Sequence, residues 1–150
     1  MFEVWKKIVV VDSFATNEEY LRFATGCCEV NSRVKKMILR NDFPISNGKK
    51  EFSVVRAHLS LLGIEGVASM DGILSAGGKF GLKEFPPFLA PYVRREYQEQ
   101  KNGECLNCAM NLIDKKILTV NHHKAGFCVG CSSGNSNGTW HSADQFLFVL

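Results

Sequence analysis

The chain has 150 residues, of which 45% are hydrophobic and 22% charged, and its formal net charge is +3. This composition is typical of an ordered globular protein and excludes an intrinsically disordered chain. The longest apolar run near the start, residues 8–11, is far shorter than the roughly 20 residues that a membrane-spanning helix needs. No secretory signal is recognisable. The sequence therefore predicts an intracellular protein, cytoplasmic or (in a eukaryote or virus) nuclear, without a membrane partner.

The first part of the chain predicts a mixture of strands and helices. The β-branched run 7–11 is typical of a buried strand. Thr16 followed by Glu19 forms a capping box and predicts the start of a helix there. Further elements are predicted from hydrophobic spacing and turn residues: a helix at 29–40, a loop at 41–50, a strand at 52–55, an apolar helical segment at 57–62 ended by Gly63, and a hairpin at 67–76 turning at Asp71-Gly72.

The second part begins after the sequence Phe85-Pro86-Pro87-Phe88, which is the most plausible boundary between two lobes. Pro91 is suited to the first turn of a helix at 92–100, which Gly103 would end. The apolar run 146–150 predicts a buried strand that ties the lobes together. We therefore expect an α+β protein with a mixed lobe at 1–88 and a small zinc-stapled, ββα-like lobe at 89–150.

The strongest motif is a pair of Cys-x-x-Cys sequences in the second lobe. Cys105 and Cys108 form the first, and Cys128 and Cys131 form the second after 19 intervening residues. This spacing is typical of a structural zinc site with four thiolate ligands arranged as a tetrahedron. Closing the loop between the motifs around Zn²⁺ would stabilise a lobe too small for a large core.

Two histidines stand between these motifs. A predicted strand at 116–120 is followed by Asn121, His122 and His123. In metal-dependent nucleases a histidine activates water while a neighbouring ligand holds Mg²⁺ on the scissile phosphate. The sequence therefore predicts a candidate phosphodiesterase site at these three residues.

The segments 97–108, 118–123 and 126–131 together resemble the phage recombination endonuclease VII family of ββα-metal (His-Asn-His) nucleases. The resemblance implies that His122 is the general base and that Asn121 occupies the position of the family's metal-binding Asp, with catalytic Mg²⁺ beside structural Zn²⁺. The chain departs from the family's pattern at Asn121, because Mg²⁺ prefers carboxylate oxygens. It departs again at Ser132, where the family has Asn.

A non-catalytic zinc module that binds nucleic acid or a protein partner is the main alternative. In that alternative, phosphate would be contacted by Lys115, Lys116, Lys124, Arg94 and Arg95. A separate basic cluster between residues 33 and 56 could also dock phosphates without reading sequence. Its members are Arg33, Lys35, Lys36, Arg40, Lys49, Lys50 and Arg56. Cleavage that depends on magnesium would separate the nuclease from this binding module.

Two further enzyme classes fit parts of the sequence. The Cys-x-x-Cys-Ala segment is similar to papain-like toxin domains, in which Cys105 or Cys108 at a helix N-terminus would be the nucleophile. His141 and Asp144 would then be the base and its orienting group. A zinc deaminase needs a His-x-Glu sequence before the Cys-x-x-Cys motif, but Ser60 follows His58 at that spacing and leaves no proton shuttle.

Overall fold

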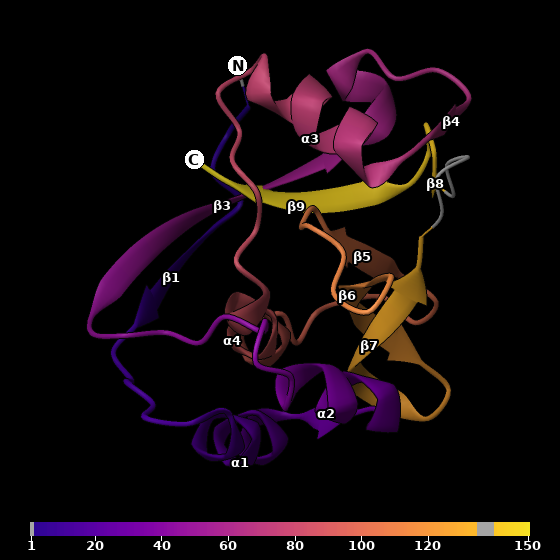
Figure 1. The fold of residues 1–150 in the computed structure, drawn as a ribbon. Coiled ribbons are helices and arrows are strands. Elements are labelled where there is room, and N and C mark those ends of the chain that lie inside the picture. The colour runs from indigo at the N-terminus through magenta and orange to yellow at the C-terminus, as the bar shows by residue number, and fades with distance from the viewer. Residues whose placement is uncertain (1, 135–139) are drawn as a thin grey trace.

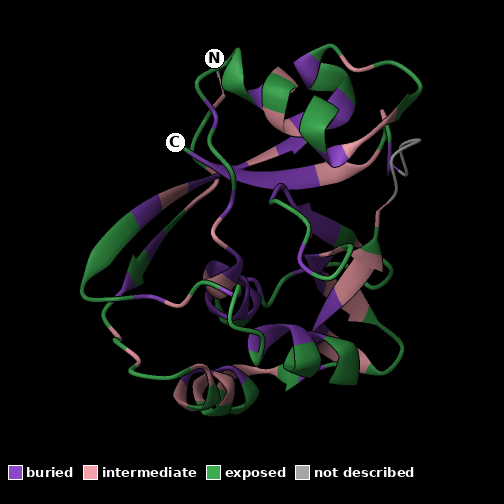
Figure 2. Cartoon of the chain, viewed as in Figure 1, coloured by how far each residue is buried: buried purple, intermediate pink, exposed green. Residues whose placement is uncertain are grey.

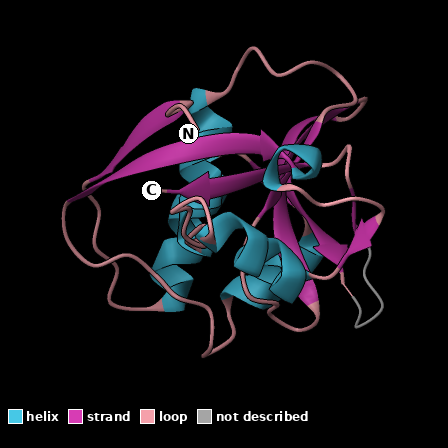
Figure 3. Ribbon diagram, turned by 90° about the horizontal axis from the view of Figure 1, so that it is seen from above, coloured by secondary structure: helices cyan, strands magenta, loops and turns pink. Residues whose placement is uncertain are grey.

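The computed structural model describes residues 2–134 and 140–150. The strands are β1 (Lys6–Val10), β2 (Glu29–Val30), β3 (Lys50–His58), β4 (Val67–Ala68), β5 (Cys105–Cys108), β6 (Lys116–His123), β7 (Gly126–Ser133), β8 (Trp140–His141) and β9 (Gln145–Val149). The helices are α1 (Asn17–Cys27), α2 (Ser32–Ile38), α3 (Met70–Gly78) and α4 (Ala90–Glu96), with 3-10 turns η1 (Leu59–Leu62) and η2 (Pro87–Leu89). Helices and strands both contribute (Figure 3), so the predicted α+β class is confirmed.

Seven strands form one sheet in the order β1-β3-β9-β5-β6-β7-β2, and β4 pairs separately with β8. Helices α1, α2 and α4 lie on one side of this sheet, and α3 lies on the other side, over β9 (Figure 1). Strand β9 is buried over most of its length (Figure 2), because it lies between β3 and β5. The expectation of a terminal strand that ties the two parts of the chain together is confirmed.

The predicted boundary at residue 88 does not divide the structure. Strand β3 comes from the first part of the chain and pairs with β9 from the second. Strand β2 likewise pairs with β7. Buried side chains from both parts form a single hydrophobic cluster. The proline pair lies at the start of a short helical segment, where Pro87 opens η2, and not in a linker between lobes.

Capping residues set where the first two helices begin, and the capping box predicted at Thr16 is confirmed. Thr16 caps α1 by accepting a hydrogen bond from the amide of Glu19, while the Glu19 carboxylate accepts one from the amide of Ala15. The helix predicted at 29–40 begins later, at Ser32, because the Asn31 side chain caps it by accepting from the amides of Arg33 and Val34. The preceding residues, 29–30, are extended and pair with β7.

The hairpin predicted at 67–76 is wrong, since residues 70–78 form helix α3. The Ser69 hydroxyl caps this helix by accepting from the amide of Gly72, which lies in the first turn instead of in a hairpin turn. The helix buries Met70, Ile73 and Gly77 against the core. Packing against the sheet therefore overrides the turn preference of the Asp-Gly sequence.

Two other predicted helices are shorter than expected. Residues 57–58 continue β3, and only the four residues of η1 are helical before Gly63, whose φ of 80° is left-handed. Helix α4 ends at Glu96 instead of continuing to residue 100. The chain turns there because the buried Arg94 guanidinium donates hydrogen bonds to the Tyr97 carbonyl and the Gln100 side chain.

Candidate thiol site

Both Cys-x-x-Cys motifs lie within strands, which separates the two cysteines of each motif. Side chains alternate between the faces of a sheet, so residues three apart on a strand lie on opposite faces. Cys105 and Cys128 share one face, because both pair in register with Asn121 on β6. Cys108 and Cys131 belong to the other face, where Cys108 is fully buried.

The four predicted zinc ligands are therefore not brought together. Over residues 2–134 and 140–150, no group of three or more His, Cys, Asp or Glu side chains is arranged to hold a metal ion. A tetrahedral site needs four ligand atoms within bonding distance of one point, and a seven-stranded sheet that places two thiols on each face does not provide it. The donor set does not fit the expected structural Zn²⁺.

The three predicted catalytic residues are also divided between the two faces. His122 lies on the helix-covered face, where its Nδ1 donates to the Gln100 carbonyl at 2.6 Å and its ring stacks on Phe127 at 4.1 Å. Asn121 and His123, one position to each side, lie on the opposite face with Cys128. Asn121 and His122 therefore do not converge on one Mg²⁺ and one water, as the nuclease reading requires. The position at which a ββα motif would continue into its helix, after β7, includes residues 135–139, which lie outside the described residues.

The face that contains Asn121 and His123 brings a thiol and an imidazole into contact. Nε2 of His123 lies 3.2 Å from Sγ of Cys128. The amide of Ala125 donates a hydrogen bond to Nδ1 of the same ring at 3.2 Å. Because Nδ1 accepts this bond, the proton of the neutral ring is on Nε2, which therefore donates to Cys128 Sγ. His123 is exposed, whereas Cys128 is only 7% exposed.

A row of polar side chains continues from this pair across the sheet. Asn121 Nδ2 lies 4.0 Å from Cys128 Sγ and donates to Thr119 Oγ1 at 2.8 Å. Gly130, directly opposite Thr119 on β7, leaves room for this amide, since a Cβ there would lie 2.7 Å from Asn121 Nδ2. We call Cys128, His123, Asn121, Thr119 and Cys105 the thiol site.

Cys105 ends the row on β5 and differs from Cys128 in its surroundings. Desolvation by the surrounding protein raises the pKa of the Cys105 thiol to about 11, although the residue is exposed at the surface, and a hydrogen bond from Thr119 opposes the rise. Cys105 is therefore protonated at neutral pH. Cys131, on the other face, also has a raised pKa because of desolvation, which the nearby Lys116 and Arg33 oppose. Neither of these two thiols has a histidine partner within the described part of the chain.

The residues of the other predicted sites have structural partners. Cys105 and Cys108 lie on β5 and not at a helix N-terminus, so the papain-like arrangement is absent. His141 and Asp144 form a turn, in which the His141 amide donates to the Asp144 carboxylate at 2.9 Å. Nδ1 of His58 donates to the Ala143 carbonyl at 3.0 Å, as expected of a histidine with a satisfied ring.

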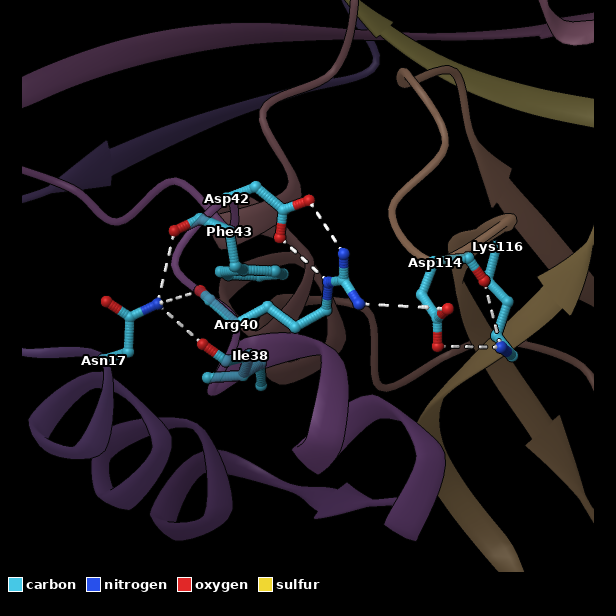
Figure 4. A network of polar contacts seen from close by, with 7 residues as sticks. All are labelled: Asn17, Ile38, Arg40, Asp42, Phe43, Asp114 and Lys116. Carbon is cyan, nitrogen blue, oxygen red and sulfur yellow. Dashed lines mark hydrogen bonds and ion pairs between the residues drawn. The ribbon is translucent and has the colours of Figure 1, made fainter.

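Two of the seven predicted basic residues are held by carboxylates of the protein itself. Figure 4 shows Arg40 bonded to Asp42, with Asp114 on its far side at 3.9 Å and Lys116 beyond it. Arg56 donates to the Glu104 carboxylate at 3.0 Å and to Tyr97 and Gln145. The exposed basic residues that remain are on α2 and at the start of β3: Arg33, Lys35, Lys36, Lys49 and Lys50.

The thiol site was only partly foreseeable. Cys128, His123, Asn121 and Cys105 were all singled out by sequence, but for metal binding or hydrolysis of phosphodiesters. The alternation of side chains along strands 105–108 and 126–133 is the signal that places the two cysteines of each motif on opposite faces.

No helix in the described parts of the chain is long and apolar enough to cross a membrane. The chain matches no protein-family model, no curated protein and no solved structure.

Proposed function

We propose that this protein acts through a nucleophilic thiol, Cys128, whose sulfur atom is contacted by the side chains of His123 and Asn121. The observation that carries the proposal is the 3.2 Å contact between His123 Nε2 and Cys128 Sγ. The thiolate is the nucleophilic form of cysteine, and hydrogen bonds donated to sulfur favour it over the neutral thiol. The proposal makes the chain a thiol-dependent enzyme or thiol-transfer protein.

The surroundings of Cys128 support this role. The residue lies in the middle of a strand that is paired on both sides, with Asn121 on β6 and Glu29 on β2, so its position is rigid. The Asn121 amide is in turn held by Thr119. Binding sites on strands are more precisely positioned than those on loops. His123, at the exposed end of β6, places the pair at the molecular surface.

Nucleic-acid binding stays a prediction from the sequence. The basic residues on α2 and at the start of β3 are exposed and available for phosphate, but the described residues include no group of metal ligands that would cleave a phosphodiester. Zinc binding and the resemblance to the endonuclease VII family likewise rest on the motif spacing alone. The thiol–imidazole contact is a more specific arrangement, because it needs two particular side chains at one distance.

The proposal is tested by measuring the rate at which iodoacetamide alkylates Cys128, resolved by peptide mass spectrometry. His123→Phe keeps a ring of similar size but removes the donor, so we expect the Cys128 rate to fall about tenfold, corresponding to about 1.4 kcal/mol. His141→Phe is the matched control, since His141 is also an exposed strand histidine and it bonds Asp144 through its backbone amide, which the substitution keeps. An unchanged Cys128 rate in folded His123→Phe protein would refute the proposed role of His123.

A further inference from the structure

We infer that the electrophile attacked by Cys128 is a sulfur atom of a small disulfide, and not an acyl carbon. This inference rests on the proposed function, because it needs Cys128 to be nucleophilic. It is carried by two features of the thiol site: where the backbone donors around Cys128 are directed, and which nitrogen of His123 holds the proton. Together they disfavour acyl transfer and favour thiol–disulfide exchange.

Attack on an acyl carbon produces an oxyanion that needs preorganised donors. In thiol hydrolases and related enzymes these are commonly free backbone N–H groups near the nucleophile. Cys128 lies between β6 and β2, so the backbone groups around it belong to the sheet ladders. It is also within a strand and not at a helix N-terminus. The site therefore lacks the backbone arrangement that would stabilise a tetrahedral intermediate.

Acyl transfer also needs a group that accepts a proton and later donates it to the leaving group. His123 is poorly suited to this task, because the Ala125 amide donates to its Nδ1 and the proton is already on Nε2. Accepting a second proton would require breaking the bond from Ala125. Thiol–disulfide exchange needs no such proton shuttle, since a thiolate replaces a thiolate.

The proposed step balances without a metal or cofactor. The Cys128 thiolate attacks one sulfur of the disulfide R–S–S–R, a new S–S bond forms, and the original S–S bond breaks. The leaving group departs as R–S⁻ with the electron pair of the broken bond and takes its proton from water. The Nε2–H group of His123 and the amide of Asn121 face Cys128 Sγ and can donate to sulfur as charge spreads over the three sulfur atoms.

The product is expected to remain a mixed disulfide, because no second thiol is within bonding reach of Cys128. Cys105 is separated from it by β6, which places the two Cα atoms about 10 Å apart at the usual strand spacing. An unstrained disulfide needs Cα atoms within about 7 Å. Cys131 lies on the other face of the sheet. So does Cys28, because this extended residue directly precedes Glu29, the residue that pairs in register with Cys128. Release therefore requires an external thiol.

The test uses the intact chain and the uncharged probe 2-hydroxyethyl disulfide. An uncharged probe is neither attracted nor repelled by Glu29, which pairs with Cys128, or by Lys124, which follows His123 in the chain. A parallel sample receives p-nitrophenyl acetate as the acyl probe. Cys128→Ser is the negative variant, and Cys131→Ser is its matched control on the same strand. Iodoacetamide labelling of the same protein reports separately whether Cys128 is nucleophilic at all.

We expect a mixed disulfide at Cys128 that forms in wild type and Cys131→Ser protein at least tenfold faster than at any other cysteine. We expect at most one equivalent of p-nitrophenol to be released per Cys128, because a nucleophilic thiol is acylated once by this activated ester and the site does not turn the acyl group over. Release of many equivalents of p-nitrophenol that depends on Cys128, or rapid iodoacetamide labelling without a mixed disulfide, would overturn the inference while leaving the proposed function intact. An internal Cys105–Cys128 disulfide would overturn the geometric argument. Slow iodoacetamide labelling of Cys128 would instead refute the proposed function itself.

Discussion

Gly130 is the residue on which the geometry of the thiol site depends most directly. Its missing side chain lets the Asn121 amide lie flat against the sheet between Thr119 and Cys128. The backbone at Gly130 is not left-handed, so alanine can adopt the same conformation. The effect of an alanine substitution on stability therefore depends on the contact between its Cβ and Asn121. The position is therefore a steric probe of Asn121 that leaves both reacting side chains in place.

Gly130→Ala should displace the Asn121 amide, since its Cβ would lie 2.7 Å from Nδ2 and 3.1 Å from Thr119 Oγ1. We expect a loss of about 1–3 kcal/mol in the free energy of unfolding, as for other overpacked sites. We also expect slower alkylation of Cys128. Chemical denaturation and labelling measure the two effects. Full stability together with unchanged labelling would show that Asn121 is not held where the structure places it.

At the scale of elements, some helices and strands follow from local sequence patterns, whereas others depend on packing against the rest of the protein. The capping box at Thr16 and the apolar run that forms β9 were predictable, because both depend on local residue types. Helix α3 was not predictable, since the Asp71-Gly72 sequence alone favours a turn. In the folded chain, Ser69 caps the helix and Ile73 is buried in the core, and these contacts stabilise the helix instead. The zinc site predicted from the cysteines of the two Cys-x-x-Cys motifs failed for a related reason. Their spacing suits a metal-binding turn, whereas strand pairing places them on opposite faces.

The adjacent glycines at the end of α3 provide a matched pair for its docking against β9. A Cβ at Gly77 would lie 2.7 Å from Cε1 of Phe148, whereas a Cβ at Gly78 would meet nothing within 4 Å. We expect Gly77→Ala to destabilise the protein by about 1–3 kcal/mol. Gly78→Ala should be neutral or stabilising by up to about 1 kcal/mol, because alanine favours helix. Thermal unfolding compares them, and equal effects of the two substitutions would contradict the packing of α3 on β9.

For the whole molecule, the distribution of thiols predicts how stability depends on pH. Desolvation by the surrounding protein raises the pKa of Cys28 to about 12 and that of Cys105 to about 11, from the ordinary thiol value of 9.0. Between pH 9 and these values the folded chain holds protons that the unfolded chain has lost. The stabilisation is therefore fully present below pH 9 and is lost as pH rises through 11 and 12.

We expect the free energy of unfolding to fall as the pH rises from 9 to 11. Cys28→Ala should reduce the slope over this range, because one thiol with a raised pKa is removed. Urea denaturation at successive pH values measures both slopes, and Cys131→Ala offers a comparison at a half-buried thiol. A stability that stays constant from pH 9 to 11 in the wild-type chain would contradict the raised pKa values of Cys28 and Cys105.

The central claim is that Cys128 is the reactive thiol of this chain, and peptide-resolved alkylation of the folded wild-type protein tests it most directly. Brief exposure to substoichiometric iodoacetamide at neutral pH lets the six cysteines compete under one condition. Cys131 is more exposed than Cys128 but has no histidine partner among the residues that the structure describes, so exposure alone would favour Cys131. We predict that Cys128 is labelled at least tenfold faster than Cys131 and Cys105. Faster labelling of Cys131 or Cys105 would contradict the claim.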